Sequence, residues 1–171
     1  MNIFMLDYNP ILAARMHCDK HVVKMILESA QMLSTAHRVL DGDGYADYNR
    51  LYRETHKNHP INIWIRESYH NYQWLHFLFV NLLLEYKKRY KKTHACDRLV
   101  NHLSSCPDNI NTGIETDINS LPQCMPDEYK VKGDAVQAYR NYYLGEKAYF
   151  AKWDRGTSEP IWWKEKNNEL Y

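Results

Sequence analysis

A line of polar side chains suited to proton transfer runs along one predicted helix, from His17 to Thr35. At about 100° per residue, their spacings of 4, 3, 4, 3 and 4 residues place them on a single helix face. All of these groups donate or accept hydrogen bonds near neutral pH. The pattern is typical of a cleft wall, and a solvated face of a surface helix is the alternative. The residues of this face are His17, His21, Lys24, Glu28, Gln31 and Thr35.

Lys24 and Glu28 are the residues of this face with the most specific chemistry. They are four residues apart, so a helix places them one turn apart on the same side. A carboxylate beside an amine can transfer protons while the amine attacks a carbonyl-like carbon, as Schiff-base formation requires. The alternative is an ordinary surface ion pair worth about 0.2–0.5 kcal/mol.

A second interpretation of the same residues is a metal site. His17 and His21 are spaced i,i+4, and Glu67 and His70 form Glu-x-x-His, a spacing seen in carboxylate-bridged dimetal bundles. A helical metalloenzyme would use these four residues together with Glu28. The second Glu-x-x-His that such bundles carry is absent, so we expect neither a metal nor another cofactor.

A cationic run follows at the end of the second predicted long helix: Lys87, Lys88, Arg89, Lys91 and Lys92. Tyr86 and Tyr90 interrupt it, and rings between cations suit a phosphate backbone with stacked bases. The alternative is that these cations interact favourably with the helix dipole.

The elements that position these residues are predicted to be helices. Asn9-Pro10 begins a first helix that runs to about Leu40, and a second runs from Ile61 to about Lys92. The second is apolar nearly all round between 74 and 84, so the two should pack together with buried centres at Trp74, Leu78 and Leu82. Shorter helices are expected at 93–104 and 135–153, separated by an irregular segment at 107–133. The C-terminal tail should be extended and carry Trp162 and Trp163.

The length of 171 residues indicates one domain over residues 1–171, and the helical patterns above make it mainly α. The chain is 44% hydrophobic and 25% charged, which suits a soluble globular protein. A net charge of +1 argues against coating nucleic acid electrostatically but allows a local basic patch. We expect free cysteines, no signal peptide and no membrane partner, hence a cytoplasmic location.

Several of these features occur together, in the same order, in one known family. They are Asp19-x-His21 followed by Glu28, then His59 before the second long helix, the basic end of that helix, and Pro160-x-Trp162-Trp163. On these residues the chain resembles the pyrimidine-dimer DNA glycosylases, the phage endonuclease V family, and their relatives. The loop at 41–55 and the segment at 93–133 have no counterpart in that pattern.

The resemblance implies a compact helical domain that kinks DNA, extrudes a nucleotide and cleaves a glycosidic bond. In the family, the N-terminal α-amine attacks the sugar C1′ and a helix carboxylate supports catalysis. The Schiff base that results permits β-elimination and strand cleavage. By position, Glu28 matches the carboxylate, His21 a histidine beside the site, and Trp162 and Trp163 aromatics close to the DNA.

Two departures from the family pattern bear on the chemistry. Leu27 and Gln31 stand where the family has arginines that grip phosphate. The nucleophilic amine is normally exposed by removing Met1 before a small residue, but here Asn2 follows, so Met1 is expected to stay. The candidate nucleophile is therefore the amine of Met1, with Lys24 or Lys20 as the replacement.

From these observations we expect a DNA-acting enzyme, a base-excision glycosylase with lyase activity or a related base-modifying enzyme. Its DNA would be duplex or locally unpaired, and its compartment the host cytoplasm if it is phage-encoded. Glu28, Lys24, Met1 and His21 would be catalytic, while His17, Gln31, His59, Trp162 and Trp163 would contact substrate. A non-catalytic nucleic-acid-binding module of the same fold is the alternative in a different class.

Overall fold

The computed structural model describes residues 1–168 of the chain, with side chains up to Lys166. It is mainly helical, as expected, and the described residues contain no strand. The elements in chain order are α1 (Pro10–Met16), α2 (Asp19–Asp41), α3 (Asp43–Tyr48), α4 (Pro60–Glu67), α5 (Tyr69–Tyr90), the 3-10 turn η1 (Ala95–Leu99), α6 (Val100–Ser104), the 3-10 turns η2 (Ile118–Ser120) and η3 (Asp127–Tyr129), α7 (Ala135–Tyr142), the π-helical turn η4 (Tyr143–Lys147) and α8 (Ile161–Asn168).

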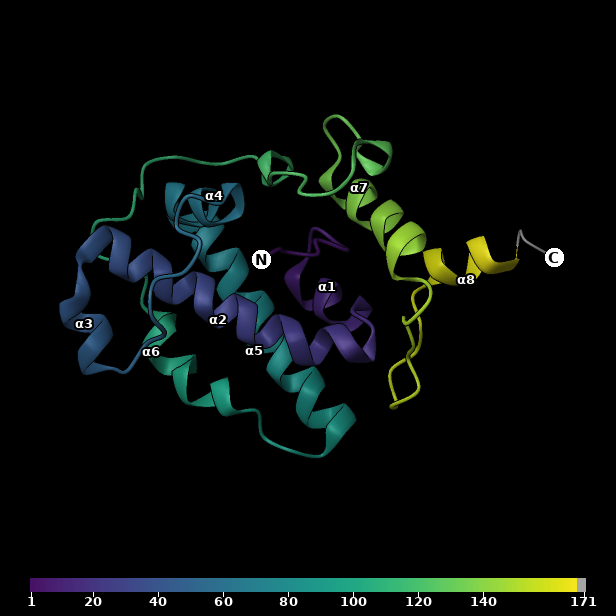
Figure 1. The fold of residues 1–171 in the computed structure, drawn as a ribbon, viewed down its shortest axis with the longest axis horizontal. Helices are drawn as coiled ribbons and strands as arrows, with labels where there is room; N and C mark the ends of the chain where they lie inside the picture. Colours follow the sequence, from purple (N-terminus) through teal and green to yellow (C-terminus); the bar gives the residue numbers. More distant parts are fainter. Residues whose placement is uncertain (169–171) are drawn as a thin grey trace.

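Two long helices, α2 and α5, pack against each other at the centre of the molecule (Figure 1). In this view α3 and α6 lie towards one end, and α7 and α8 towards the other. The predicted packing is confirmed: Trp74, Leu78 and Leu82 on α5 are buried against the core. None of the described helices combines the length and apolar composition that a membrane span requires.

The first predicted helix is interrupted, which corrects the expectation of one helix from Pro10 to Leu40. α1 ends at Met16, His17 is extended with φ −60° and ψ 134°, and α2 begins at Asp19. His17 therefore does not share a continuous helix face with His21. No glycine or proline marks this break in the sequence. Its cause is a set of long-range contacts at His17 and Asp19, which are described below.

The second predicted helix is interrupted too, at Ser68, which is extended with φ −149° and ψ 154°. The Ser68 side chain accepts a hydrogen bond from Asn71 N and so caps α5, a common role for serine. α5 then ends at Tyr90, and Lys91 takes a left-handed conformation with φ 56°. The helix is shorter at both ends than the sequence pattern predicts.

The C-terminal region also differs from expectation. The helix predicted to reach Trp153 leaves regular α geometry after Tyr142 and passes through the π-helical turn η4. Trp162 and Trp163 lie in helix α8 rather than in an extended segment. Trp163 is buried against Trp153, with ring centroids 4.9 Å apart, so the first turn of α8 is fixed to the core.

A buried guanidinium joins four parts of this fold. Arg89 of α5 has no exposed side-chain surface, and its Nε donates to Glu85 at 2.8 Å. Its Nη1 donates to the Asp19 carboxylate at 3.0 Å and to the His17 carbonyl at 2.8 Å. Its Nη2 donates to the Arg15 carbonyl at 2.9 Å. Arg89 thus accounts for the break between α1 and α2, since it binds carbonyls that a continuous helix would use internally.

Removing the guanidinium should be strongly destabilising. We expect Arg89→Met to lower the free energy of unfolding by about 3–5 kcal/mol, because Asp19 and Glu85 would be left buried without a counter-charge. The matched control is Lys87→Met, an exposed cation on the same helix, which should change it by no more than about 0.5 kcal/mol. Urea denaturation measures both. Equal stabilities for the two variants would contradict the structural role given to Arg89.

Candidate active site

Three nitrogen atoms surround the carboxylate of Glu28. The α-amine of Met1 lies 3.9 Å from Oε2, and the backbone N–H of Asn2 donates to the same oxygen at 3.1 Å. Lys24 Nζ lies 3.5 Å from the other oxygen, Oε1. The Glu28 side chain is 15% exposed, so this cluster sits at the surface but is partly shielded from water. The predicted i,i+4 pair therefore has a further amine beside it.

An extended N-terminal arm brings Met1 to this position. Residues 3–6 of the arm are buried in the core, which anchors it without a strand. The Asn2 side chain then fixes the end of the arm, since its Nδ2 donates to the Cys124 carbonyl at 3.0 Å and its Oδ1 accepts from the Tyr139 hydroxyl at 2.9 Å. The amine is thus held at Glu28 by contacts far along the chain.

His21 lies one helical turn before Lys24 and is nearly buried. Its ring stacks on Phe4 with centroids 4.5 Å apart, and its Nδ1 is 2.7 Å from the Tyr143 hydroxyl. Burial, followed by the charges of neighbouring groups, lowers the pKa of His21 to about 3. His21 is therefore a neutral imidazole at physiological pH, held in one orientation by Tyr143.

His17 is fully buried, and its Nδ1 donates to the Ala13 carbonyl at 2.7 Å. Its Nε2 has no hydrogen-bond partner among the described residues. Burial lowers the pKa of His17 to about 4, so this imidazole is neutral as well. The expectation that His17 contacts substrate is not supported by its position, because no part of the ring reaches the surface.

Gln31 and His59 come from different elements, α2 and the residue before α4. Gln31 is half-buried one turn after Glu28 on α2, as the predicted helix face requires. His59 precedes α4, and its Nδ1 accepts from Ile61 N at 3.2 Å. Partial burial, and then the charge of the N-terminal amine, lowers the pKa of His59. That effect indicates that His59 lies within electrostatic range of the Met1 amine.

Trp162 and Trp163 hold the start of α8 to the body of the protein. The Trp162 indole N–H donates to Met16 Sδ at 3.4 Å. The guanidinium of Arg140 lies over the Trp162 ring, 5.6 Å from the ring centroid. Trp163 is buried. These contacts account for both rings without a ligand, and the structure does not bring either ring to Glu28.

The basic run divides into two groups. Lys87, Lys88, Lys91 and Lys92 are exposed, and Lys88 donates to the Thr157 hydroxyl at 3.1 Å. Arg89 is buried, which corrects the expectation that it contacts phosphate. Tyr86 and Tyr90 stack on each other with centroids 5.0 Å apart, so these rings are already partnered within the protein.

The metal interpretation lacks the geometry it needs. The break at Ser68 separates Glu67 from His70, so Glu-x-x-His does not lie on one continuous helix, and both side chains are exposed. Within residues 1–168, no group of three or more His, Cys, Asp or Glu side chains is placed to hold a metal ion. The structure does not bring Glu67 and His70 together with His17, His21 and Glu28.

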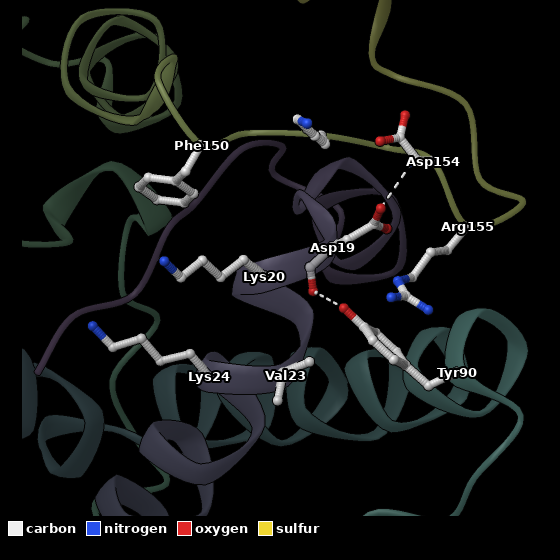
Figure 2. A pocket seen from close by; sticks show the side chains of 9 residues that line it. Asp19, Lys20, Val23, Lys24, Tyr90, Phe150, Asp154 and Arg155 are labelled. Atoms are coloured by element: carbon white, nitrogen blue, oxygen red, sulfur yellow. Dashed lines mark hydrogen bonds between the residues drawn. The ribbon is translucent and has the colours of Figure 1, made fainter.

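A cleft opens beside Lys24, although Glu28, Gln31 and Thr35 of the predicted cleft wall do not line it. It has a volume of about 680 Å³, and α2, the end of α5 and residues 150–155 line it (Figure 2). A smaller hollow of about 210 Å³ adjoins it through Lys20, Lys24 and Phe150 and reaches His21 and Lys147. Glu28 does not line either space, but its partner Lys24 lines both. The cleft residues from 147–155 show no motif that would have identified them.

Comparison with protein-family models, with curated proteins and with solved structures gave no match to the chain.

The neutral state of the buried imidazoles predicts how stability depends on pH. The unfolded chain binds a proton on each imidazole below about pH 6.5, whereas folded His21 does so only near its pKa of about 3. The contribution of neutral His21 to the free energy of unfolding is therefore fully present above about pH 6.5. As pH falls below about 6.5, this contribution decreases by about 1.4 kcal/mol per pH unit. We expect His21→Gln to reduce the slope of unfolding free energy against pH by about that amount between pH 6.5 and 5.

Urea denaturation at several pH values measures this slope. The control is His70→Gln, at an exposed position, and it should leave the slope as in the unaltered protein. A His21→Gln slope equal to that of the control would show that His21 is not buried in its neutral form.

Proposed function

We propose that the protein is a DNA-acting enzyme of the base-excision kind, with Glu28 as its catalytic carboxylate and a primary amine beside it as nucleophile. One observation carries the proposal: a terminal amine and a lysine amine approach different oxygens of the same carboxylate, at 3.9 Å and 3.5 Å. A terminal amine beside a helix carboxylate is the pair that the resemblance to the pyrimidine-dimer glycosylases implies, and Lys24 is the replacement amine that this sequence offers. A surface ion pair alone would not require a buried arm to deliver the chain's first residue.

The proposed reaction begins with attack of the amine nitrogen on the sugar C1′. The bond from C1′ to the base breaks as the new C–N bond forms, and the base leaves with the bonding electrons and gains a proton. The C1′–O4′ bond then breaks as the C1′–N double bond forms; O4′ takes the bonding electrons and a proton from the nitrogen, and the product is an imine, the Schiff base. Glu28 is positioned to transfer protons to and from the amine and to stabilise the positive charge on the sugar.

The N-terminal amine is the better-placed nucleophile of the two. Met1 N is held by the arm, and the nitrogen of Asn2 is closer still to Glu28, at 3.1 Å. If Met1 is removed, the free amine therefore belongs to Asn2 and lies within hydrogen-bond distance of the carboxylate. Lys24 is largely exposed, with 65% of its side-chain surface accessible, so water competes for its amine.

The test is turnover and borohydride trapping on DNA carrying an excisable base or an abasic site. We expect Glu28→Gln to fold and bind DNA while turnover falls at least about 10²-fold, the low end for acid–base catalysis. Lys24→Met should keep the trapped adduct, whereas acetylation of the N-terminus should abolish it. Intact mass identifies the terminal residue, and Lys132→Met is the control for an exposed lysine outside the site.

Normal turnover by Glu28→Gln would refute the assignment of the carboxylate. DNA binding without any trapped adduct or turnover in the unaltered protein would favour the alternative, a non-catalytic binding module of this fold. Loss of the adduct in Lys24→Met would move the nucleophile from the N-terminus to Lys24.

A further inference from the structure

The cleft beside Lys24 gathers cations from two distant parts of the chain. Lys20 and Lys24 come from the first turns of α2, and Lys152 and Arg155 from the segment after η4. Lys147 extends the set into the adjoining hollow. In Figure 2, Lys20 and Lys24 extend side by side to the left, on the side of Phe150, and Arg155 lies at the right beside Tyr90. We call these five residues the cationic cleft.

Most of this charge is not neutralised within the protein. Among the described residues, no carboxylate forms an ion pair with Lys20, Lys147, Lys152 or Arg155, and only Lys24 has such a partner, Glu28. Two acidic residues line the cleft. Asp19 is paired with buried Arg89 and also accepts from Asp154 N, whereas Asp154 is exposed. The cleft therefore carries a net positive charge.

Aromatic rings hold several of these cations in place without removing their charge. Lys20 Nζ lies 4.9 Å from the Phe150 ring centroid, Arg155 lies 4.4 Å from that of Tyr90, and Lys147 lies 4.4 Å from that of Tyr142. Such cation–π contacts are worth about 0.5–1 kcal/mol at exposed sites. Lys20 and Lys24 are one turn apart on α2, where like charges repel each other, and a bound anion would relieve that repulsion.

The rim of the cleft offers a ring for stacking. Tyr149 lines the hollow beside Lys24 and Lys147, and 86% of its surface is exposed. Only an edge contact to Phe150, at 4.9 Å between centroids, engages its ring within the described residues. A positively charged groove combined with an available aromatic ring is the arrangement that proteins use for single-stranded nucleic acid.

We propose that the cationic cleft binds a locally unpaired nucleic-acid strand, with phosphates on Lys20, Lys152 and Arg155 and a base stacked on Tyr149. Lys24 lines the cleft and pairs with Glu28, so a bound strand would be separated from the proposed catalytic carboxylate by one side chain. The volume of about 680 Å³ lies within the range of about 300–1,000 Å³ that suits a nucleotide-sized group rather than the convex side of a duplex. This inference rests on the proposed function for the role of the strand, but it concerns binding and can be tested without turnover.

The experiment measures binding of a short fluorescein-labelled single strand, and of the same sequence as a duplex, by anisotropy over a salt series. The double variant Lys152→Ala, Arg155→Ala should flatten the log–log salt slope by roughly 1.4, or about 0.7 per phosphate contact on a single strand. Tyr149→Ala should weaken single-strand binding about 5- to 150-fold, the range that corresponds to 1–3 kcal/mol of stacking, and should affect the duplex less.

Two matched controls lie outside the cleft. Tyr48→Ala removes a ring that is 88% exposed, and Lys132→Ala removes an exposed lysine, and neither should change binding. The double variant Lys87→Ala, Lys92→Ala tests the end of α5 as the competing phosphate surface. Thermal melting of each variant verifies folding. Folding is expected because the altered side chains are all exposed, and because Lys152 contacts Asp19 through its backbone carbonyl, which the substitution keeps.

An unchanged slope in the cleft variant, with a flattened slope in the α5 variant, would overturn the proposal and place phosphates on the α5 surface instead. Full displacement of the strand by a free mononucleotide would overturn it in favour of a nucleotide site. Strand binding that depends on the cleft, without a borohydride adduct, would support the cleft and refute the proposed chemistry. A borohydride adduct, together with an unchanged salt slope in the cleft variant, would support the proposed chemistry and refute the role of the cleft.

Discussion

The buried guanidinium of Arg89 is the constraint on which the rest of the structure depends. It binds the last carbonyls of α1 and the first carboxylate of α2, and so it ends one helix and fixes the direction of the next. Without it, the pattern of residues 10–40 favours one long helix. A buried ion pair of this kind contributes little net stability compared with apolar packing, but losing one partner is costly. Its effect here is to specify one geometry.

The same group links α2 to the C-terminal part of the chain. Asp19 is held by Arg89 and in turn accepts from Asp154 N, while Asp19 N donates to the Lys152 carbonyl at 2.8 Å. Glu85, the other partner of Arg89, accepts from the Thr157 hydroxyl at 2.8 Å. Residues 152–157 are therefore fixed against the start of α2. The cationic cleft exists because this connection brings two lysine-bearing segments together.

The sequence predicts those parts of the fold that depend on local patterns. Burial of Leu78 follows from the apolar run in α5, and the Lys24–Glu28 pair follows from spacing on α2. The break at His17 could not be predicted, because its cause is Arg89, 72 residues further along the chain. In the sequence, Arg89 and the exposed cations beside it belong to one basic run, and nothing in that pattern sets Arg89 apart. Only tertiary contacts distinguish a buried guanidinium from a phosphate ligand.

The candidate site shows the same division between local and distant causes. Helical spacing alone leaves Glu28 as half of an ordinary surface pair. What makes it a candidate catalytic group is the arm that places Met1 beside it, and that arm is held by Asn2 through partners at Cys124 and Tyr139. A carboxylate with one amine from its own helix and another delivered by distant contacts is difficult to explain as solvation of a surface. The irregular segment at 107–133 therefore has a structural purpose: it includes the carbonyl of Cys124 that holds the arm at Glu28.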